Sequence, residues 1–445
     1  MASPTATVIV VNWNGGHMLP DCLAALDRQT LRDFQIWVVD NASTDGSCEL
    51  LARDFPDVRV LANPDNRGFA GGNNTALREV ITQYAVLLNN DATPEPDWLG
   101  HLLAPFALDP KLAAVTSKVV FAPRFVPLRL KTTPFVPGGA DPRELGLRVL
   151  TIEVDGEDIT EQVLWERLSY GPEGEGAGRY RWTRPAGELL LPVRTEGCHE
   201  VVVRWLAESD KDVVLSWLDG TATLHVAAQV SQATLTLPAG VPTVDVINNA
   251  GSIVLTAGYG ADRGYQEVDR GQYDTTEDVF ALCGCAVALR TEAGAAVGWF
   301  DDDFFLYYED TDLSWRLRAA GWRLSYEPTA VVRHIHAASS VEWSPRFVFH
   351  TDRNRLLMLT KNATAGRATR EVLRYPLTTA SMTVRLLRQA ARTRHRPAVR
   401  PMLLRLQVLR SYLRLLPTML RSRRRLGRSA TVTRADLETW LIDRG

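Results

Sequence analysis

The chain has 445 residues, 45% hydrophobic and 23% charged, which is typical of a globular protein with room for two or three domains. Its formal net charge of −2 excludes a general affinity for nucleic acid, so we expect no nucleic-acid partner. No basic leader precedes a long apolar core, and no uncharged apolar run reaches spanning length, so neither a signal peptide nor a transmembrane helix is expected. The five cysteines are odd in number and lack zinc-site spacing, which favours reduced thiols in a cytosolic protein.

The first part of the chain alternates short apolar runs with helical patterns, an order that predicts a parallel sheet with right-handed crossovers. Strands are expected at 6–11, 35–39, 58–62 and 84–88, and helices at 18–29, 47–54 and 72–81. In such sheets, ligands bind beyond the carboxyl ends of the strands. Polar clusters stand at those ends, at 12–15, 40–43, 66–73 and 89–91. The sequence therefore predicts one crevice on which four strand ends converge.

A second kind of pattern begins near residue 125, where short alternating runs are separated by Gly, Pro and Asp turns. These runs predict an all-β sandwich. The α/β pattern returns near Val244, so the sandwich is expected as an insertion. The predicted domains are 1–124 and 245–345 for the two parts of the α/β domain, 125–244 for the insertion and 346–445 for a helical region. Tryptophans 182, 205 and 217 of the insertion either fill its core or stack on sugar rings.

The helical region is strongly basic. Residues 353–428 contain 20 Arg and Lys side chains and a single acid, Glu371. Leu, Val and Met interleave with the arginines, which predicts amphipathic helices on an anionic membrane surface. A solvated helical bundle and a nucleic-acid-binding arm are the competing interpretations.

Chemistry is concentrated at 307–316, where three carboxylates, three aromatic side chains and an arginine fall within ten residues. A helix is predicted here, ending at Gly321, with Glu309 and Asp310 at its positive end. The stretch is either a reaction centre or an acidic helix cap with a solvated face.

Other candidate side chains follow apolar strands. Asp40 can accept hydrogen bonds from a pyrimidine ring or a ribose, and the glycine-rich segment 68–72 can bring backbone close to a diphosphate. Asp91 stands where a divalent cation could bridge two phosphates. His334 is a second candidate ligand, and His336, on the same side of the strand, is its alternative.

Together, these ordered motifs resemble family two glycosyltransferases of the GT-A fold, and their pattern is similar to bacterial rhamnosyltransferases. The resemblance covers roughly residues 5–123 and 245–345. It rests on the segments 10–15, 38–43, 67–73, 88–91, 284–286 and 308–312, and on Arg316, His334 and Ser339.

The resemblance implies inverting transfer of a sugar from a nucleoside diphosphate to an acceptor hydroxyl. Asp310 would be the base, and Glu309 would orient or tune it. Mg²⁺ or Mn²⁺, bound by Asp91 and His334, would stabilise the departing diphosphate. Trp315 and Arg316 would lie near acceptor and phosphate. Donor-binding positions are implied at Val11, Asn12, Asn14, Asp40, Asn41, Gly68, Phe69, Ala70, Asn73, Asn90 and Gly284.

One departure concerns the metal. Many family members carry two aspartates around a single residue, where this chain has Asn89 and Asp91. Losing one carboxylate lowers the negative charge of the site and makes its dependence on the metal less certain.

The resemblance favours dTDP-rhamnose as the donor, with a UDP-sugar as the alternative. The basic tail favours a polyprenyl-linked cell-envelope glycan as the acceptor, at the cytoplasmic face of the membrane. A non-catalytic carbohydrate-binding or scaffold protein at the membrane surface is the competing class. A Rossmann dehydrogenase is disfavoured, because no Gly-x-Gly-x-x-Gly follows the first strand.

Overall fold

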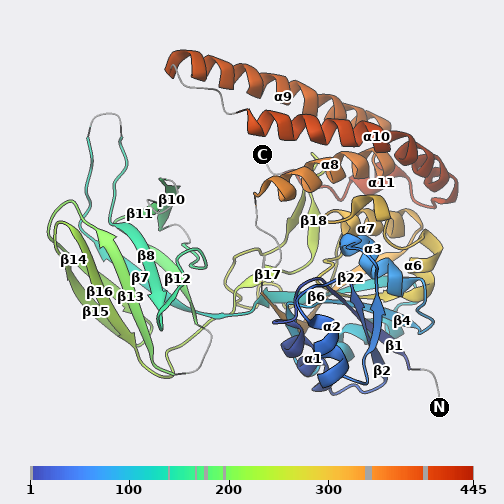
Figure 1. The fold of residues 1–445 in the computed structure, drawn as a ribbon, viewed down its shortest axis with the longest axis horizontal. Helices are drawn as coiled ribbons and strands as arrows, with labels where there is room; N and C mark the ends of the chain where they lie inside the picture. Colours follow the sequence, from blue (N-terminus) through green and yellow to red (C-terminus); the bar gives the residue numbers. More distant parts are fainter. Residues whose placement is uncertain are drawn as a thin grey trace. The chain divides into compact units, whose positions relative to one another are not determined.

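The computed structural model describes residues 4–138, 141–165, 168–174, 179–193, 197–335, 343–393 and 399–443 (Figure 1). The chain forms two compact units. Unit 1 comprises Met1–Ala122, Ile247–Tyr265 and Gly271–Gly445, and unit 2 comprises Pro123–Val246 and Gln266–Arg270.

The first half of unit 1 is a parallel arrangement of strands with helical crossovers. Its strands are β1 (Ala6–Asn12), β2 (Phe34–Asp40), β3 (Arg59–Ala62) and β4 (Tyr84–Asn89), and its helices are α1 (Leu19–Asp27), α2 (Ser47–Asp54) and α3 (Gly68–Leu77). β1 lies between β2 and β4, with Asn12 opposite Asp40 and Val11 opposite Asn89. The expected alternation of strands and helices is confirmed. The glycine-rich segment differs from expectation, because it forms the first turn of α3 rather than a loop.

The complete sheet of unit 1 is mixed rather than wholly parallel. It runs in the order β20-β22-β6-β21-β4-β1-β2-β3. The added strands are β5 (Ala92–Pro94), β6 (Leu112–Phe121), β17 (Ile247–Asn249), β20 (Glu277–Asp278), β21 (Ala286–Arg290) and β22 (Arg323–His334). β21 is antiparallel to both β4 and β6, while β22 is parallel to β6. Val8 and Val10 of β1 enter one hydrophobic layer and Ile9 enters the other, so the sheet is covered on both faces.

The remaining elements of unit 1 flank this sheet. They are α4 (Trp98–Leu103), α5 (Pro105–Leu108), β18 (Ser252–Val254), β19 (Gly260–Asp262), α6 (Thr291–Val297), the 3₁₀ turn η2 (Asp302–Phe304), α7 (Glu309–Ala319), α8 (Pro345–Asn362), α9 (Ala365–Thr393), α10 (Arg400–Ser429) and α11 (Arg434–Glu438). α7 is the helix predicted before Gly321, whose φ of 89° suits glycine.

The C-terminal helices belong to unit 1 and share a hydrophobic core with it. Trp315 of α7, Leu356 of α8, Tyr375 of α9 and Tyr412 of α10 all enter this core. α9 and α10 run alongside each other next to α8 (Figure 1). Within the described residues, none of the helices combines the length and apolar character required to span a bilayer.

Unit 2 consists of two antiparallel sheets. One contains β7 (Arg124–Thr132), β12 (Ala186–Val193), β14 (Lys211–Trp217) and β15 (Gly220–Val226). The other contains β8 (Arg148–Val154), β9 (Glu157–Asp158), β10 (Ser169–Glu173), β11 (Tyr180–Thr183), β13 (His199–Leu206) and β16 (Val230–Leu237). Side chains of both sheets share one core, which includes Trp205 and against which Trp217 packs partly buried. Trp182 is also buried, so the structure favours packing over sugar stacking for Trp182 and Trp205.

Candidate functional site

Asn12 connects the carboxyl ends of three neighbouring strands. Its Nδ2 lies 3.2 Å from Asp40 Oδ1 as donor, and its Oδ1 accepts a hydrogen bond of 2.8 Å from Asn90 Nδ2. Asp40 Oδ2 in turn accepts from the backbone N–H of Ser43 at 2.9 Å. The side chains meet because β1 lies between β2 and β4. The result is a preorganised, largely buried polar cluster.

The turn after β1 is held against the turn after β2. Asn14 adopts a left-handed φ of 51°, its N–H donates to Ser43 Oγ at 2.9 Å, and its Oδ1 accepts from the N–H of Thr44 at 2.7 Å. A Cβ on Gly15 would lie 2.2 Å from Asn90 Nδ2, so this turn requires glycine. Trp13, which precedes Asn14, is 39% exposed.

The start of α3 packs closely against this cluster. Asn41 Nδ2 donates to the Gly68 carbonyl at 2.9 Å, and the N–H of Ala70 donates to the Phe305 carbonyl at 3.2 Å. Gly68 has a φ of 68°, and a Cβ there would lie 2.3 Å from the Phe305 carbonyl oxygen. The close approach that requires glycine at Gly68 is therefore made by the protein's own backbone.

Two further donor-binding candidates complete this region. Asn73 Nδ2 donates to the Phe69 carbonyl at 2.9 Å, which ties the first turn of α3 together. Val11 of β1 faces Gly72, where a Cβ would lie 2.8 Å from Val11 Cγ1.

Glu309 and Asp310 begin α7, where the positive end of the helix dipole lies. Asp310 Oδ1 accepts from the Thr311 N–H at 2.6 Å, and Oδ2 accepts from the Gly284 N–H at 3.3 Å. Burial raises the pKa of Asp310, and these backbone bonds partly oppose the rise. Burial, with the neighbouring charge of Asp310, raises the pKa of Glu309 well above its usual value. The pKa of Glu309 is therefore raised more strongly than that of Asp310, whose backbone donors favour the charged form.

Gly284 lies between the start of α3 and the start of α7. A Cβ on Gly284 would lie 3.1 Å from Phe69 Cζ and 3.7 Å from Asp310 Cβ. Burial raises the pKa of both flanking thiols, and the charge of Asp310 adds to the rise at Cys283 while that of Asp91 adds to it at Cys285. The charges of Asp310 and Asp91 therefore both raise thiol pKa values within the segment 283–285. The raised pKa values make these thiols poor nucleophiles.

Asp91 and His334 lie side by side, on the turn after β4 and at the end of β22. Asp91 Oδ1 is 3.2 Å from His334 Nε2. His334 Nδ1 is 3.1 Å from the amide oxygen of Asn248, which only accepts, so Nδ1 is the donor. Asp91 Oδ1 is buried and receives no hydrogen bond from the described part of the chain. Asp91 Oδ1 and His334 Nε2 therefore lie close enough together to contact one cation.

A preformed cluster of three or more His, Cys, Asp or Glu ligands is absent from the described residues. Mg²⁺ and Mn²⁺ commonly use one or two protein ligands and take the rest from phosphate and water, so the two-residue site is compatible with them. His336 and Ser339 lie outside the described residues.

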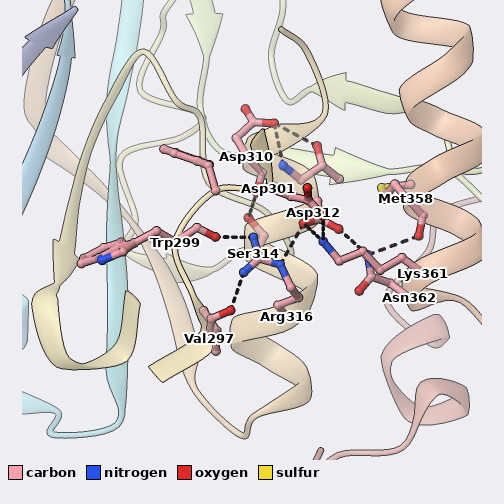
Figure 2. Close-up of polar contacts among 12 residues, drawn as sticks. Val297, Trp299, Asp301, Asp310, Asp312, Ser314, Arg316, Met358, Lys361 and Asn362 are labelled. Carbon is pink, nitrogen blue, oxygen red and sulfur yellow. Dashed lines mark hydrogen bonds and ion pairs between the residues drawn. The ribbon is translucent and has the colours of Figure 1, made fainter. Parts of the chain in front are cut away.

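The structure corrects the expectation for Arg316, which Figure 2 shows, and for Trp315. Arg316 is 4% exposed, and its guanidinium donates to Asp312 Oδ2 at 2.8 Å and to the carbonyls of Val297 and Trp299. Trp315 is buried edge-to-face against Phe280. Both side chains are committed to the interior, so neither is placed to contact acceptor or phosphate.

Asp312 is the centre of this interior network (Figure 2). Lys361 Nζ donates to Asp312 Oδ2 at 2.8 Å and to Asp301 Oδ2 at 2.6 Å, and Asn362 Nδ2 donates to Asp312 Oδ1 at 2.8 Å. Burial alone would raise the pKa of Asp312, but Lys361 and Arg316 lower it below its usual value. Asp312 therefore joins α7 to α8 as an ionised carboxylate.

The sequence did not predict that side chains at the start of α8 would lie near Trp13 and Phe305. The Arg346 guanidinium lies 5.6 Å from the Trp13 ring centre and 5.7 Å from that of Phe305, and it forms no ion pair within the described residues. His350 stacks on Phe305, and burial, with the nearby Arg353 and Arg346 charges, lowers its pKa to about 4. These residues lie beyond the recognised motifs, and only their basic and aromatic composition hinted at them.

Comparison with known proteins identifies the region that carries the cluster. Residues 7–155 match the family model described as Glycosyl transferase family 2. The pre-mycofactocin glycosyltransferase of Mycobacterium tuberculosis is 35% identical over 95 residues, which cover 20% of this chain and 19% of that protein. The N-acetylglucosaminyl-diphospho-decaprenol L-rhamnosyltransferase of the same species is 44% identical over 59 residues, 13% of this chain and 19% of that protein.

The chain therefore spans about a fifth of the length of these curated relatives. Among solved structures, the mannosyltransferase PcManGT from Pyrobaculum calidifontis in complex with GDP-Man and Mn²⁺ is similar with a TM-score of 0.40 and 14% identity. The similarity covers 94% of this chain and 88% of that chain.

Proposed function

This chain carries a family 2 glycosyltransferase domain of the GT-A fold, and from that premise we propose that it transfers a sugar, with inversion, from a nucleoside diphosphate to an acceptor hydroxyl. The proposed donor is dTDP-rhamnose, with a UDP-sugar as the alternative. The proposed acceptor is a growing, polyprenyl-linked cell-envelope glycan.

The observation that carries the proposal is the position of Gly284 between the start of α3 and the start of α7. Asp310, the proposed base, accepts from the Gly284 N–H, while Phe69 at the start of α3 closes on the other side of this glycine. The strand-end cluster of Asn12, Asp40 and Asn90 lies on the same sheet, at the carboxyl ends of β1, β2 and β4. Donor-binding and proton-accepting groups are thus supplied from both halves of the domain.

In the proposed reaction, the Asp310 carboxylate takes the proton from the acceptor hydroxyl as its oxygen attacks the anomeric carbon. The bond from that carbon to the diphosphate breaks on the opposite face, which inverts the configuration. Protonated Glu309 keeps the charge of the pair on Asp310, where two backbone N–H groups orient the carboxylate.

Asp91 and His334 would hold Mg²⁺ or Mn²⁺ in this proposal, supported by the buried Asp91 oxygen, which accepts no hydrogen bond from the described residues, and by its distance of 3.2 Å from His334 Nε2. The bound cation would neutralise charge on the departing diphosphate. Asn89 in place of a second carboxylate leaves the protein with fewer anionic ligands, so donor phosphates and water would have to supply the remaining ligands.

We also propose that the enzyme acts as a peripheral protein on the cytoplasmic face of the membrane, through α9 and α10. Eight of their large apolar side chains, Leu373, Leu377, Val384, Leu387, Leu403, Leu406, Leu413 and Leu420, are between 42% and 69% exposed. The only acid in the two helices, Glu371, is buried and paired with Arg355 and Arg370. The solvent-facing surface of the helices is therefore apolar and cationic, which suits anionic lipid.

The corresponding domain assignment is part of the proposal. Residues 1–124 and 245–345 form the transferase domain, 125–244 an inserted β sandwich with acceptor binding or partner docking as its hypothetical role, and 346–445 the helical region that faces the membrane. The two sheets of unit 2 with their shared core support the sandwich.

The first experiment is a screen of dTDP-rhamnose, UDP-GlcNAc and GDP-mannose for thermal stabilisation, with and without Mn²⁺, followed by donor turnover. We expect one donor to stabilise the protein in the presence of Mn²⁺ and Asp310→Asn to lower turnover by about 10²- to 10⁴-fold. Asp57→Asn, at an exposed loop aspartate, is the control. Wild-type turnover in the Asp310 variant would refute the base. Binding without any turnover by the wild type would favour a non-catalytic carbohydrate-binding protein.

A further inference from the structure

The loop that precedes α7 has a strained backbone. Phe305, Tyr307 and Tyr308 are non-glycine residues with φ values of 63°, 67° and 70°. Bulky side chains avoid this left-handed region, and such residues persist only where surrounding groups hold them. Because Tyr308 immediately precedes Glu309 and Asp310, the strain lies next to the proposed base.

The groups that hold this loop come from α8. Asn354 is fully buried, and its Nδ2 donates to the carbonyls of Phe304, Leu306 and Tyr307 at 2.8, 2.8 and 2.7 Å. Its Oδ1 accepts from Arg353 Nε at 2.9 Å, which fixes the orientation of the amide. The two N–H bonds of a single amide thus serve three carbonyls of the loop, so at least one of these hydrogen bonds is shared.

Arg353 supports the same loop. Its Nη2 donates to the carbonyls of Asp303 and Phe304, each at 3.0 Å. The side chain is buried, and burial lowers its pKa. Two adjacent residues of α8 therefore act together on the backbone before α7.

The loop touches both functional halves of the site. On the donor side, the Phe305 carbonyl accepts from the Ala70 N–H at 3.2 Å, and Phe305 closes over Gly68. On the base side, the Tyr308 carbonyl accepts from the Asp312 N–H at 2.8 Å in the first turn of α7. A shift of the loop would move the start of α3 and the start of α7 together.

A second attachment lies two helical turns along α8. There, Lys361 and Asn362 hold Asp312, as Figure 2 shows. Because Lys361 and Asn362 already attach α7 to α8, Asn354 chiefly restricts the movement of the loop before α7.

We propose that Asn354 is a positioning residue for glycosyl transfer, which sets the donor-side and base-side halves of the site relative to each other through the loop from Phe304 to Tyr308. The inference rests on the proposed function. Asn354 contacts no reacting atom and acts through the backbone carbonyls.

The test compares Asn354→Ala and the milder Asn354→Ser with the wild type. Donor turnover is measured with dTDP-rhamnose and UDP-GlcNAc in the presence of Mn²⁺. We expect kcat/KM to fall about 100-fold, through both a lower kcat and a higher donor KM, because displacement of the loop misplaces both halves of the site. The comparison variants separate the two effects: Asp310→Asn lowers kcat, and Asp40→Asn raises the donor KM.

The matched control is Thr360→Val on the same helix. It removes a buried hydrogen bond of 2.9 Å between Thr360 Oγ1 and the Tyr412 hydroxyl and leaves the loop contacts in place. We expect its kcat/KM to stay within about threefold of the wild type. A decrease in the Asn354 variants equal to that in Thr360→Val would reduce Asn354 to a structural residue and overturn the proposal.

Hydrogen exchange gives a readout that does not need turnover. In Asn354→Ser we expect amides 305–312 to exchange at least about tenfold faster, and those of β1 and β4 to be unchanged. Unchanged exchange at 305–312 would overturn the proposal even if activity fell. If the wild type turned over no donor, the proposed function would fail, while the exchange result would still decide whether Asn354 holds the loop.

Discussion

Glu309 and Asp310, the adjacent carboxylates at the start of α7, differ in the hydrogen bonds that they accept. Glu309 Oε2 is buried and receives no hydrogen bond in the described part of the structure, whereas Asp310 accepts from two backbone N–H groups. Burial disfavours both charges, and the backbone donors favour the one on Asp310. The backbone donors therefore favour the negative charge on Asp310, which suits its proposed role as the base.

The pH dependence of transfer should respond to Asp262. Burial is the main cause of the raised Asp310 pKa, and the negative charge of Asp262 adds to it. A base works only when ionised, so kcat/KM rises with pH through the Asp310 pKa. Asp262→Asn removes a neighbouring negative charge and lowers that pKa, so the acid limb of the kcat/KM profile should move to lower pH.

Asp57→Asn, an exposed and distant control, should leave that limb in place. An acid limb that stays fixed, or moves to higher pH, in Asp262→Asn would show that Asp310 is not the group that titrates.

Single residues also show what the sequence could predict. The placement of Asn12, Asp40 and Asn90 after apolar strands predicted that they would lie together, and they do, because parallel strands joined by helical crossovers end at the same edge of the sheet. Their roles in donor binding stay predictions. Arg316 was misjudged, because its Asp312 partner at helical spacing was visible in the sequence but the carbonyls of Val297 and Trp299 were not.

At the scale of elements, the paired helices α7 and α8 carry an unusual amount of buried charge. Lys361 is held between Asp301 and Asp312, and Arg316 neutralises Asp312 from the other side. The sequence could not predict this arrangement, because the partners lie on segments that only tertiary packing brings together. Asn354 was missed for the same reason.

Lys361→Met should be strongly destabilising. It leaves two carboxylates without their shared cation, and breaking a buried pair typically costs about 3–5 kcal/mol. The lowered pKa of Asp312 contributes stability that is present above the unfolded-state pKa and is lost as pH falls through the folded-state pKa. The difference between variant and wild type, measured by urea unfolding, should therefore be larger at pH 7 than near pH 3.

The control for this experiment is Arg370→Met. Its cation also pairs with a buried acid, Glu371, but the Arg370 side chain is 65% exposed and its removal should cost at most about 1 kcal/mol. Equal losses in the two variants would mean that burial of Lys361 adds nothing.

The mixed sheet marks the limit of element-scale prediction. The alternating pattern correctly predicted the parallel strands β1 to β4 with their helices. It did not predict the antiparallel β21 between β4 and β6, because this strand arrives after an insertion and its direction depends on distant connections. Strand pairings of long sequence separation leave no local signature.

At the scale of the whole molecule, the exposed leucines of α9 and α10 predict binding to anionic vesicles. The protein should sediment with vesicles of phosphatidylserine and phosphatidylcholine, and less so with phosphatidylcholine alone or at high salt. Leu377→Asp with Leu413→Asp should release it, since both side chains are exposed and the change adds negative charge.

Leu218→Asp is the control, because it makes the same change at a leucine of unit 2 that is 82% exposed. Release by Leu218→Asp as well would locate the lipid contact outside the two helices. Equal binding to vesicles with and without phosphatidylserine would contradict the electrostatic part of the proposal.

The connections of unit 2 allow a deletion experiment. β6 ends at Phe121 and β17 begins at Ile247, and the two strands are antiparallel neighbours with Ile247 opposite Val120. Replacing Pro123–Val246 by Asn-Gly should close them with a hairpin turn. We expect the shortened chain to keep thermal stabilisation by dTDP or UDP with Mn²⁺ and to lose transfer to the native acceptor. Full activity on that acceptor would argue against acceptor binding by unit 2.

This geometry has a consequence for how such a protein can diversify. The chain leaves the sheet from β6 and rejoins it at β17, and these two strands are hydrogen-bonded neighbours. The pairing of the two strands therefore does not depend on the length or sequence of the intervening 124 residues, Pro123–Val246. Exchange of this segment would leave the proposed reaction site at Gly284 in place. If unit 2 binds the acceptor, such an exchange would change the acceptor and keep the donor.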